Sequence, residues 1–342
     1  MQGARAALLR RTPKVELHCH LVGALRPQTV ADLAARHGIQ FGKPVEALYD
    51  FSTFTDFIDM LRLAAAVLRT REDFARVAFE LLEDGFRDCN QLHCEIMFNP
   101  QYHFPSGISY ADMADGLRDG LERARAELGV SGLLIACIDR QIDPAVAAGI
   151  MDEVVANRRD EVVGIGLDGP EGAGPPALFA HIYDTADKAG LRKTAHVCED
   201  NQPLAAAPPD HYRICRDVLR CDRLDHGYNL LFDEELTRRA ADDGLFFNVC
   251  TVTSAARNLQ RRIDSIMRMR EAGLRLTLNS DDPAMFKADI ADAHIRLFNA
   301  LDWDVTEARS LALAGIEASW LDDGAKRTLK TRFEAQFATL DI

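Results

Sequence analysis

The chain has 342 residues, of which 47% are hydrophobic and 27% charged, so it is long enough to bury a large core. Its formal net charge of −13 argues against a nucleic-acid partner, because binding to phosphates requires a basic surface. No segment approaches the run of roughly 18 apolar residues that a membrane span needs.

The N-terminus and the cysteines indicate the cellular compartment. The opening residues, MQGARAALLRR, contain no sustained apolar stretch and no small-residue cleavage site. The eight cysteines lie singly, without a CxxC pair, which fits reduced thiols and excludes the zinc signature of cytidine deaminases. We therefore expect a soluble, unprocessed, cytoplasmic protein that acts on a small molecule, with residues 1–342 forming one domain.

The first short apolar run, VELHCHL at 15–21, places two histidines one residue apart. In a strand, residues two apart share a face, so Glu16, His18 and His20 point to one side, opposite the apolar side chains. One face of this strand is therefore suited to packing and the other to binding.

Further strand-like runs follow along the chain and alternate with amphipathic stretches of helical period. Helices are predicted at 71–88 and at 110–129, where Gly129 is a C-terminal signal. Eight strands alternating with helices predict a (β/α)8 TIM barrel, with extra helices inserted after the first strand, at 28–70. An open doubly wound sheet is the alternative, although no glycine-rich phosphate loop follows the first strand. The later runs are 91–98, 132–138, 162–168, 192–197, 223–229, 245–250 and 274–282.

Ionisable side chains occur at the C-terminal ends of four of these runs. In a barrel this is the end that carries chemistry, because the outward face of each strand packs against helices. Three neutral imidazoles and one carboxylate suit zinc and leave a position for water, whose pKa the metal lowers to about 7. We predict that one zinc ion per chain is bound by His18, His20, His196 and Asp281.

Two more residues complete this predicted site. Glu199 follows His196 by three residues and is placed to donate a proton, while His226, at the end of the sixth run, could hold the hydroxide. Two-metal hydrolases on such barrels often use a lysine after the fourth strand as a bridging ligand. The segment GIGLDGPE contains no lysine, which favours one metal.

Each of these residues also has an ordinary structural explanation. A single histidine in an apolar run is more often a hydrogen-bonded core or surface residue, and Asp282 in NSDDPAMF fits a helix cap followed by proline. The joint placement at one end of four separate strands favours the functional interpretation.

Four segments resemble the signatures of the adenosine deaminase family of the amidohydrolase superfamily. They are PKVELHCHLVGALRP, TAHVCED, RLDHGYN and LTLNSDDPAMF, in the family's order and at similar spacing. LRTREDF and EIMFNPQYH resemble its connecting segments, and the resemblance extends from residue 12 to near the C-terminus.

The resemblance implies a zinc-dependent purine aminohydrolase, in which a hydroxide on zinc attacks C6 of adenosine, adenine or a related 6-aminopurine and ammonia leaves. It implies the same four zinc ligands, with Glu199 protonating N1 and His226 orienting the hydroxide. It also implies that Asp282 is a hydrogen-bond partner of N7 and that the backbone of Gly169 contacts N3.

The chain departs from the family pattern at two places. The deaminases commonly have an acidic residue, which accepts a hydrogen bond from the ribose 5'-hydroxyl, where this chain has Val22. They commonly read VCPxSN where this chain has VCTVTS, so a loop that often lines the pocket differs at Thr251–Ser254. We therefore predict that unmodified adenosine is not the best substrate, and that a base lacking ribose, a 5'-modified adenosine or another purine derivative is preferred.

Two other functions stay open at this point. The same zinc site could act on an N6-substituted purine or a non-purine amine, or the chain could be a catalytically silent ligand-binding relative. The complete set of ligands together with Glu199 and His226 weighs against a silent protein, which has no chemical need for them.

Overall fold

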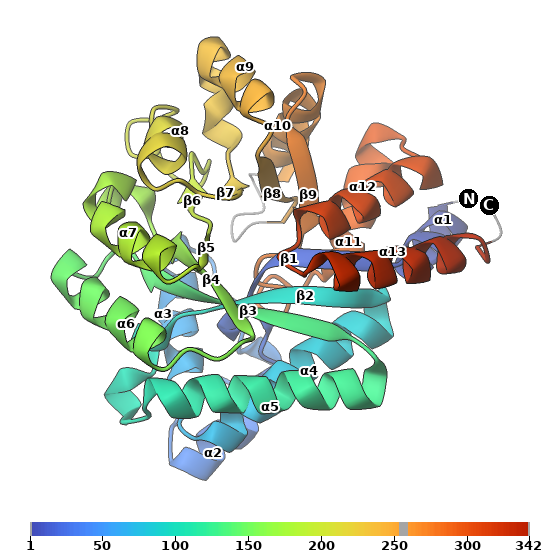
Figure 1. Cartoon of the computed structure of the whole chain (residues 1–342). Coiled ribbons are helices and arrows are strands. Elements are labelled where there is room, and N and C mark those ends of the chain that lie inside the picture. Colours follow the sequence, from blue (N-terminus) through green and yellow to red (C-terminus); the bar gives the residue numbers. More distant parts are fainter. Residues whose placement is uncertain (1, 253–258, 341–342) are drawn as a thin grey trace.

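The computed structural model describes residues 2–252 and 259–340. Parallel strands lie at its centre and helices surround them (Figure 1). The strands are β1 (Lys14–His20), β2 (Gln91–Phe98), β3 (Ser131–Asp139), β4 (Val162–Asp168), β5 (Arg192–Lys193), β6 (His196–Val197), β7 (Leu224–His226), β8 (Phe246–Cys250) and β9 (Arg275–Asn279).

The strands form two parallel sheets, with the orders β1-β2-β3-β4-β5 and β6-β7-β8-β9. β5 and β6 are two halves of the predicted fifth strand, and the backbone between them still bonds to both neighbours, through Thr194 N to Ile165 O (3.0 Å) and Asp225 N to Ala195 O (2.9 Å). At the other junction an isolated parallel bridge between Cys19 and Asp281 joins β1 to the segment after β9. The predicted (β/α)8 architecture is confirmed.

The helices follow the predicted alternation, and their ends carry recognisable signals. Thr70 and Asp73 form a capping box at the start of α4, and Gly129, with φ of 67°, ends α5. α2 and α3 form the predicted insertion after β1. The helices are α1 (Gln2–Arg11), α2 (Pro27–His37), α3 (Phe54–Ala65), α4 (Arg71–Cys89), α5 (Tyr110–Leu128), α6 (Pro144–Ala156), α7 (Ala180–Lys188), α8 (His211–Arg213), α9 (Glu234–Asp243), α10 (Leu259–Glu271), α11 (Ile290–Leu301), α12 (Val305–Ala318) and α13 (Asp323–Phe337).

Two strands are shorter than their sequence runs predict. The sixth run, 223–229, keeps only three strand residues, because the chain turns at His226 and Gly227, with φ of 69° and 84°. The eighth run, 274–282, ends as a strand at Asn279, two residues before Asp281, which also has a positive φ of 70°. Both strands therefore end where the chain turns at the C-terminal end of the barrel.

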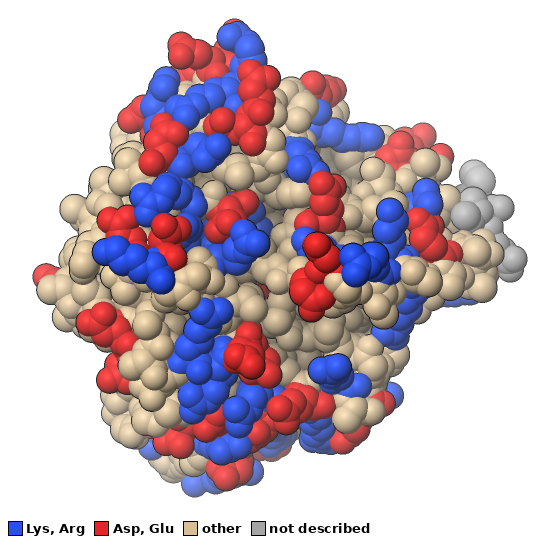
Figure 2. Space-filling view, in the orientation of Figure 1, with Lys and Arg blue, Asp and Glu red and all other residues tan. Residues whose placement is uncertain are grey.

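The main apolar core lies between the strands and the surrounding helices. The inside of the barrel is partly polar, since Arg223 forms an ion pair of 2.6 Å with Glu95, both fully buried. Acidic and basic side chains are interspersed over the face that Figure 2 shows. None of the helices in the described part of the chain combines the length and the apolar character that a membrane span requires.

Candidate active site

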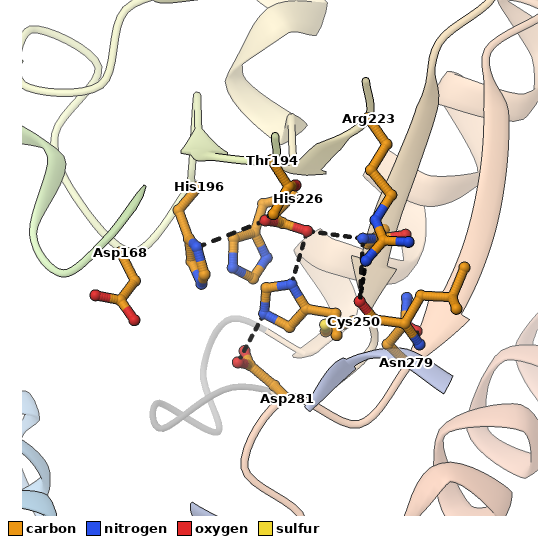
Figure 3. A network of polar contacts seen from close by, with 12 residues as sticks. Asp168, Thr194, His196, Arg223, His226, Cys250, Asn279 and Asp281 are labelled. Atoms are coloured by element: carbon orange, nitrogen blue, oxygen red, sulfur yellow. Dashed lines mark hydrogen bonds and ion pairs between the residues drawn. The ribbon is translucent and has the colours of Figure 1, made fainter. Parts of the chain in front are cut away.

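Histidine side chains from three strands converge with Asp281 at the C-terminal end of the barrel. His18 Nε2 lies 3.1 Å from Asp281 Oδ1, and His20 Nε2 lies 3.5 Å from the same oxygen. His196 Nε2 lies 3.2 Å from His20 Nε2. Figure 3 shows His196, His226 and Asp281 around one small space. The structure therefore brings together all four residues that the sequence analysis selected as metal ligands.

This cluster could hold a metal ion. Ligand atoms of His18, His196, His226 and Asp281 all lie within 4.8 Å of one another, and His20 borders the same group through His196 and Asp281. Burial lowers the pKa of His20 to about 4 and that of His196 well below its ordinary value, so both rings are neutral, as metal binding requires. Neutral imidazoles with one carboxylate are a donor set that fits zinc.

Asp225, which the sequence analysis did not select, holds His18 from behind. Its Oδ1 lies 3.0 Å from His18 Nδ1, and its Oδ2 accepts a hydrogen bond of 2.7 Å from Thr194. Although burial lowers the pKa of His18, Asp225 and Asp281 together raise it to about 10. A carboxylate on Nδ1 fixes the ring so that Nε2 faces the cluster, an arrangement that is usual behind metal-binding histidines. A cation at Nε2 would displace the proton there.

Backbone strain is present at this end of the barrel. Cys198, His226 and Asp281 have φ of 52°, 69° and 70°, in the left-handed region that residues other than glycine rarely adopt. Each follows or ends a different strand. Strain of this kind persists only where the surrounding structure imposes it, and it is typical of functional sites.

Glu199 lies beside the cluster and is paired with a buried arginine. Its Oε1 accepts a hydrogen bond of 2.7 Å from Nη2 of Arg262 in α10, and it lies 3.7 Å from Nε2 of His226. Burial raises the pKa of Glu199 while Arg262 lowers it, and the outcome is about 7. A carboxyl group with this pKa can both hold and release a proton near neutral pH. Arg262 also donates to Asp200 (2.9 Å) and to Val252 O (2.7 Å).

A second carboxylate fixes the backbone that carries Glu199. Glu171 Oε1 and Oε2 accept hydrogen bonds from the N–H groups of Cys198 (3.1 Å) and Glu199 (3.2 Å). Nδ1 of His211 lies 2.6 Å from Glu171 Oε1. These contacts hold the strained turn at Cys198, and thereby the position of the Glu199 side chain.

A cavity of about 760 Å³, including the space at its mouth, opens over the cluster. Val22 and Gly169 line it, and so does Asp282, whose buried Oδ1 has no hydrogen-bond partner among the described residues. Gly23 has no room for a side chain, because a Cβ there would lie 1.9 Å from Asp282 Oδ1. Apolar side chains from the insertion and the following loops form another wall: Phe57, Ile58, Leu61 and Phe286.

Asp168, at the end of β4, also lines the cavity. Both of its carboxylate oxygens accept from Nδ2 of Asn99, at 2.9 Å each, and Oδ2 lies 3.8 Å from His20 Nδ1. Burial and the neighbouring Asp139 raise the pKa of Asp168 to about 8, which means that the surrounding groups stabilise its ionised form only weakly.

The sequence analysis did not select every functional candidate, although the apolar face of one helix indicated a buried arginine. Arg262 was not selected, yet it shares one helical face with the buried Ile266 and Met269. An arginine on an apolar face must find a buried partner. Of the departures at 251–254, Thr251 and Val252 are buried, and Thr253 and Ser254 lie outside the described residues.

Comparisons with known proteins agree with this geometry. Residues 13–336 match the adenosine deaminase family. An adenine deaminase of Rhodospirillum rubrum is 35% identical over 339 residues, covering 96% of this chain and 98% of that protein. An amidohydrolase from Burkholderia ambifaria with bound Zn has a TM-score of 0.89 at 33% identity, covering 99% of this chain and 94% of that one. The adenine deaminase of Arthrobacter aurescens has a TM-score of 0.88 at 30% identity, covering 96% and 100%. The chain belongs to the adenosine deaminase family.

Proposed function

We propose that this protein is a zinc-dependent aminohydrolase that converts adenine and water to hypoxanthine and ammonia. The observation that carries the proposal is the buried cluster of His18, His20, His196 and Asp281 beneath a cavity, with the Glu199 carboxyl group beside it. Two relatives that this chain matches over nearly its whole length are adenine deaminases by name, which supports the choice of substrate class.

In this proposal the four clustered residues hold one zinc ion, which supplies Lewis acidity and makes a bound water nucleophilic at neutral pH. Glu199 gives its proton to N1 of the purine, which makes C6 more electrophilic. His226 orients the attacking water by a hydrogen bond. Burial lowers the pKa of His226 well below its ordinary value, so its neutral ring can accept that bond.

Two cavity groups orient the base in the same proposal. The carboxyl group of Asp282, which lines the cavity, is assigned to N7, and the backbone N–H of Gly169 is assigned to N3. Correct orientation of a flat ring over a reactive centre is itself a large part of catalysis.

The cavity wall at Val22 favours free adenine over adenosine as the substrate. Val22 stands where the family's adenosine deaminases have an acidic partner for the ribose 5'-hydroxyl, and it is buried in the cavity wall. A hydroxyl group placed against valine without another partner would cost on the order of 1 to 3 kcal/mol.

A screen of four purines tests the proposal. The purified zinc enzyme is supplied with adenine, adenosine, 5'-deoxyadenosine and N6-methyladenine, and the 6-oxopurine product of each is measured by chromatography: hypoxanthine from the two bases, inosine from adenosine and 5'-deoxyinosine from 5'-deoxyadenosine. We expect adenine to give the highest kcat/KM. A higher kcat/KM on any of the other three compounds, or no turnover of adenine, would overturn adenine as the substrate.

A further inference from the structure

We propose that Asp168 is a specificity-determining residue, whose carboxylate accepts a hydrogen bond from the N–H group of the purine five-membered ring. The free base carries this N–H group, whereas a nucleoside carries its sugar on N9. Asp168 would therefore select bases over nucleosides. This inference rests on the proposed deamination of adenine.

The contacts of Asp168 leave it short of donors. Its two carboxylate oxygens share a single amide group, Nδ2 of Asn99, while Nδ1 of His20 is 3.8 Å from Oδ2, beyond hydrogen-bond distance. Asp168 forms no ion pair with lysine or arginine in the described part of the chain. Arg140 lies nearby but directs its donors to backbone carbonyl groups, including Asp168 O (3.1 Å) and His196 O (2.6 Å). A buried carboxylate with so few donors is unfavourable unless a ligand supplies one.

The neighbouring carboxylate shows the contrast. Asp139 is paired with Asp168 in the β3–β4 register and is buried to a similar extent. It accepts hydrogen bonds from Tyr102 Oη (3.0 Å) and from the N–H group of Gln141 (2.9 Å), and it is not among the residues that line the cavity. Of this pair, the residue that faces the cavity is the one that lacks donors.

The position of Asp168 also suits the five-membered ring. In Figure 3 Asp168 and His226 lie on opposite sides of His196. Glu199 lies next to His226, at 3.7 Å, so Asp168 and Glu199 flank the histidine cluster from two sides. In a purine, N1 and the five-membered ring are on opposite sides of C6. A base with C6 over the cluster and N1 toward Glu199 therefore directs its five-membered ring toward Asp168.

The test compares adenine with 9-methyladenine, in which a methyl group replaces the N–H donor. The measured quantity is the ratio of the two kcat/KM values on one enzyme preparation, which does not depend on the folded or zinc-loaded fraction. A site built to bind an N–H group rejects an analogue without it strongly, so we expect the wild-type ratio to be about 100 or more. In Asp168→Ala and Asp168→Asn we expect the ratio to fall more than about tenfold, and in the control Asp139→Ala to stay near wild type.

The outcomes separate this inference from the proposed function. If wild type deaminates adenine but the ratio in both Asp168 variants stays within about tenfold of wild type, the role of Asp168 is wrong and the proposed function stands. If the wild-type enzyme has equal kcat/KM values for adenine and 9-methyladenine, the role of Asp168 is likewise wrong and the proposed function stands. If wild type does not deaminate adenine at all, both proposals are overturned.

Discussion

Arg262 and Glu199 form a buried ion pair at the edge of the cavity, with Nη2 of the guanidinium group 2.7 Å from Oε1 of the carboxylate. The two residues are 63 positions apart in the chain. Burial and the nearby cation act on Glu199 in opposite directions, and its pKa of about 7 is the balance between them. The following predictions depend on this pair and on the groups around it.

The activity should fall as pH rises through about 7, because Glu199 donates a proton only in its protonated form. Replacement of Arg262 by Gln removes a cation that favours the ionised form of Glu199. The pKa of Glu199 should therefore rise, and the fall of kcat/KM on the alkaline side of its pH profile should move to higher pH. Arg261→Gln is the matched control, since Arg261 is half-exposed and its contacts are with Asn229 Oδ1, at 3.4 Å, and Asp200, at 3.8 Å. An unchanged limb in Arg262→Gln, or the same shift in Arg261→Gln, would contradict this account.

Glu199→Gln should retain zinc and lose a factor of about 10² or more in kcat, as is typical on removal of a general acid. Binding of the product hypoxanthine should suffer less, because the amide keeps the shape of the side chain. Steady-state kinetics with metal analysis checks this. A variant with most of the wild-type kcat would show that another group protonates the ring.

The protein should contain about one zinc ion per chain, and a chelator should abolish its activity. Asp281→Asn should lose the metal, because Asp281 Oδ1 contacts both His18 and His20. Asp282→Asn should keep the metal and lose activity, because Asp282 faces the cavity instead. Elemental analysis of both variants would refute this division of roles if the zinc contents were reversed.

Glu171→Gln should lower kcat without removing zinc, because one amide oxygen cannot replace both carboxylate oxygens that hold Cys198 and Glu199. The unpaired donors should also reduce the free energy of unfolding by about 1 to 3 kcal/mol, measurable by denaturant titration. Glu153→Gln, on the exposed face of α6, is the control and should change neither quantity. A normal kcat in Glu171→Gln would mean that the turn keeps its shape unaided.

Val22→Asp should raise the kcat/KM for adenosine relative to adenine by roughly 5- to 150-fold, which corresponds to one regained hydrogen bond of about 1 to 3 kcal/mol. Val22→Leu preserves the apolar wall and should leave the ratio near wild type. Should Val22→Asp leave the ranking of substrates unchanged, another group satisfies the ribose hydroxyl and Val22 does not set the preference.

Much of this protein was readable from the sequence alone. Alternating apolar runs and helical periods predicted the barrel, and residue parity placed His18 and His20 on one face of the first strand. Parity was wrong for Glu16, which lies with Cys19 and Cys94 because the register of the strand shifts between Glu16 and Cys19. Local periodicity carries this information because a strand or a helix repeats its faces at a fixed interval. The family and the deaminase class, inferred from four segments, are confirmed by the comparisons.

The partners of the candidate site were decided only by the tertiary structure. Asp225 lies behind His18, Glu171 holds the Glu199 backbone, and Arg262 reaches Glu199 across 63 positions. The apolar face of α10 indicated that Arg262 is buried, but not which carboxylate it meets. Likewise, Asp168 and Asp139 end neighbouring strands, and the sequence does not show which one faces the cavity. Such contacts depend on how the barrel closes and on how far each side chain reaches, and neither is encoded in the period of a single element.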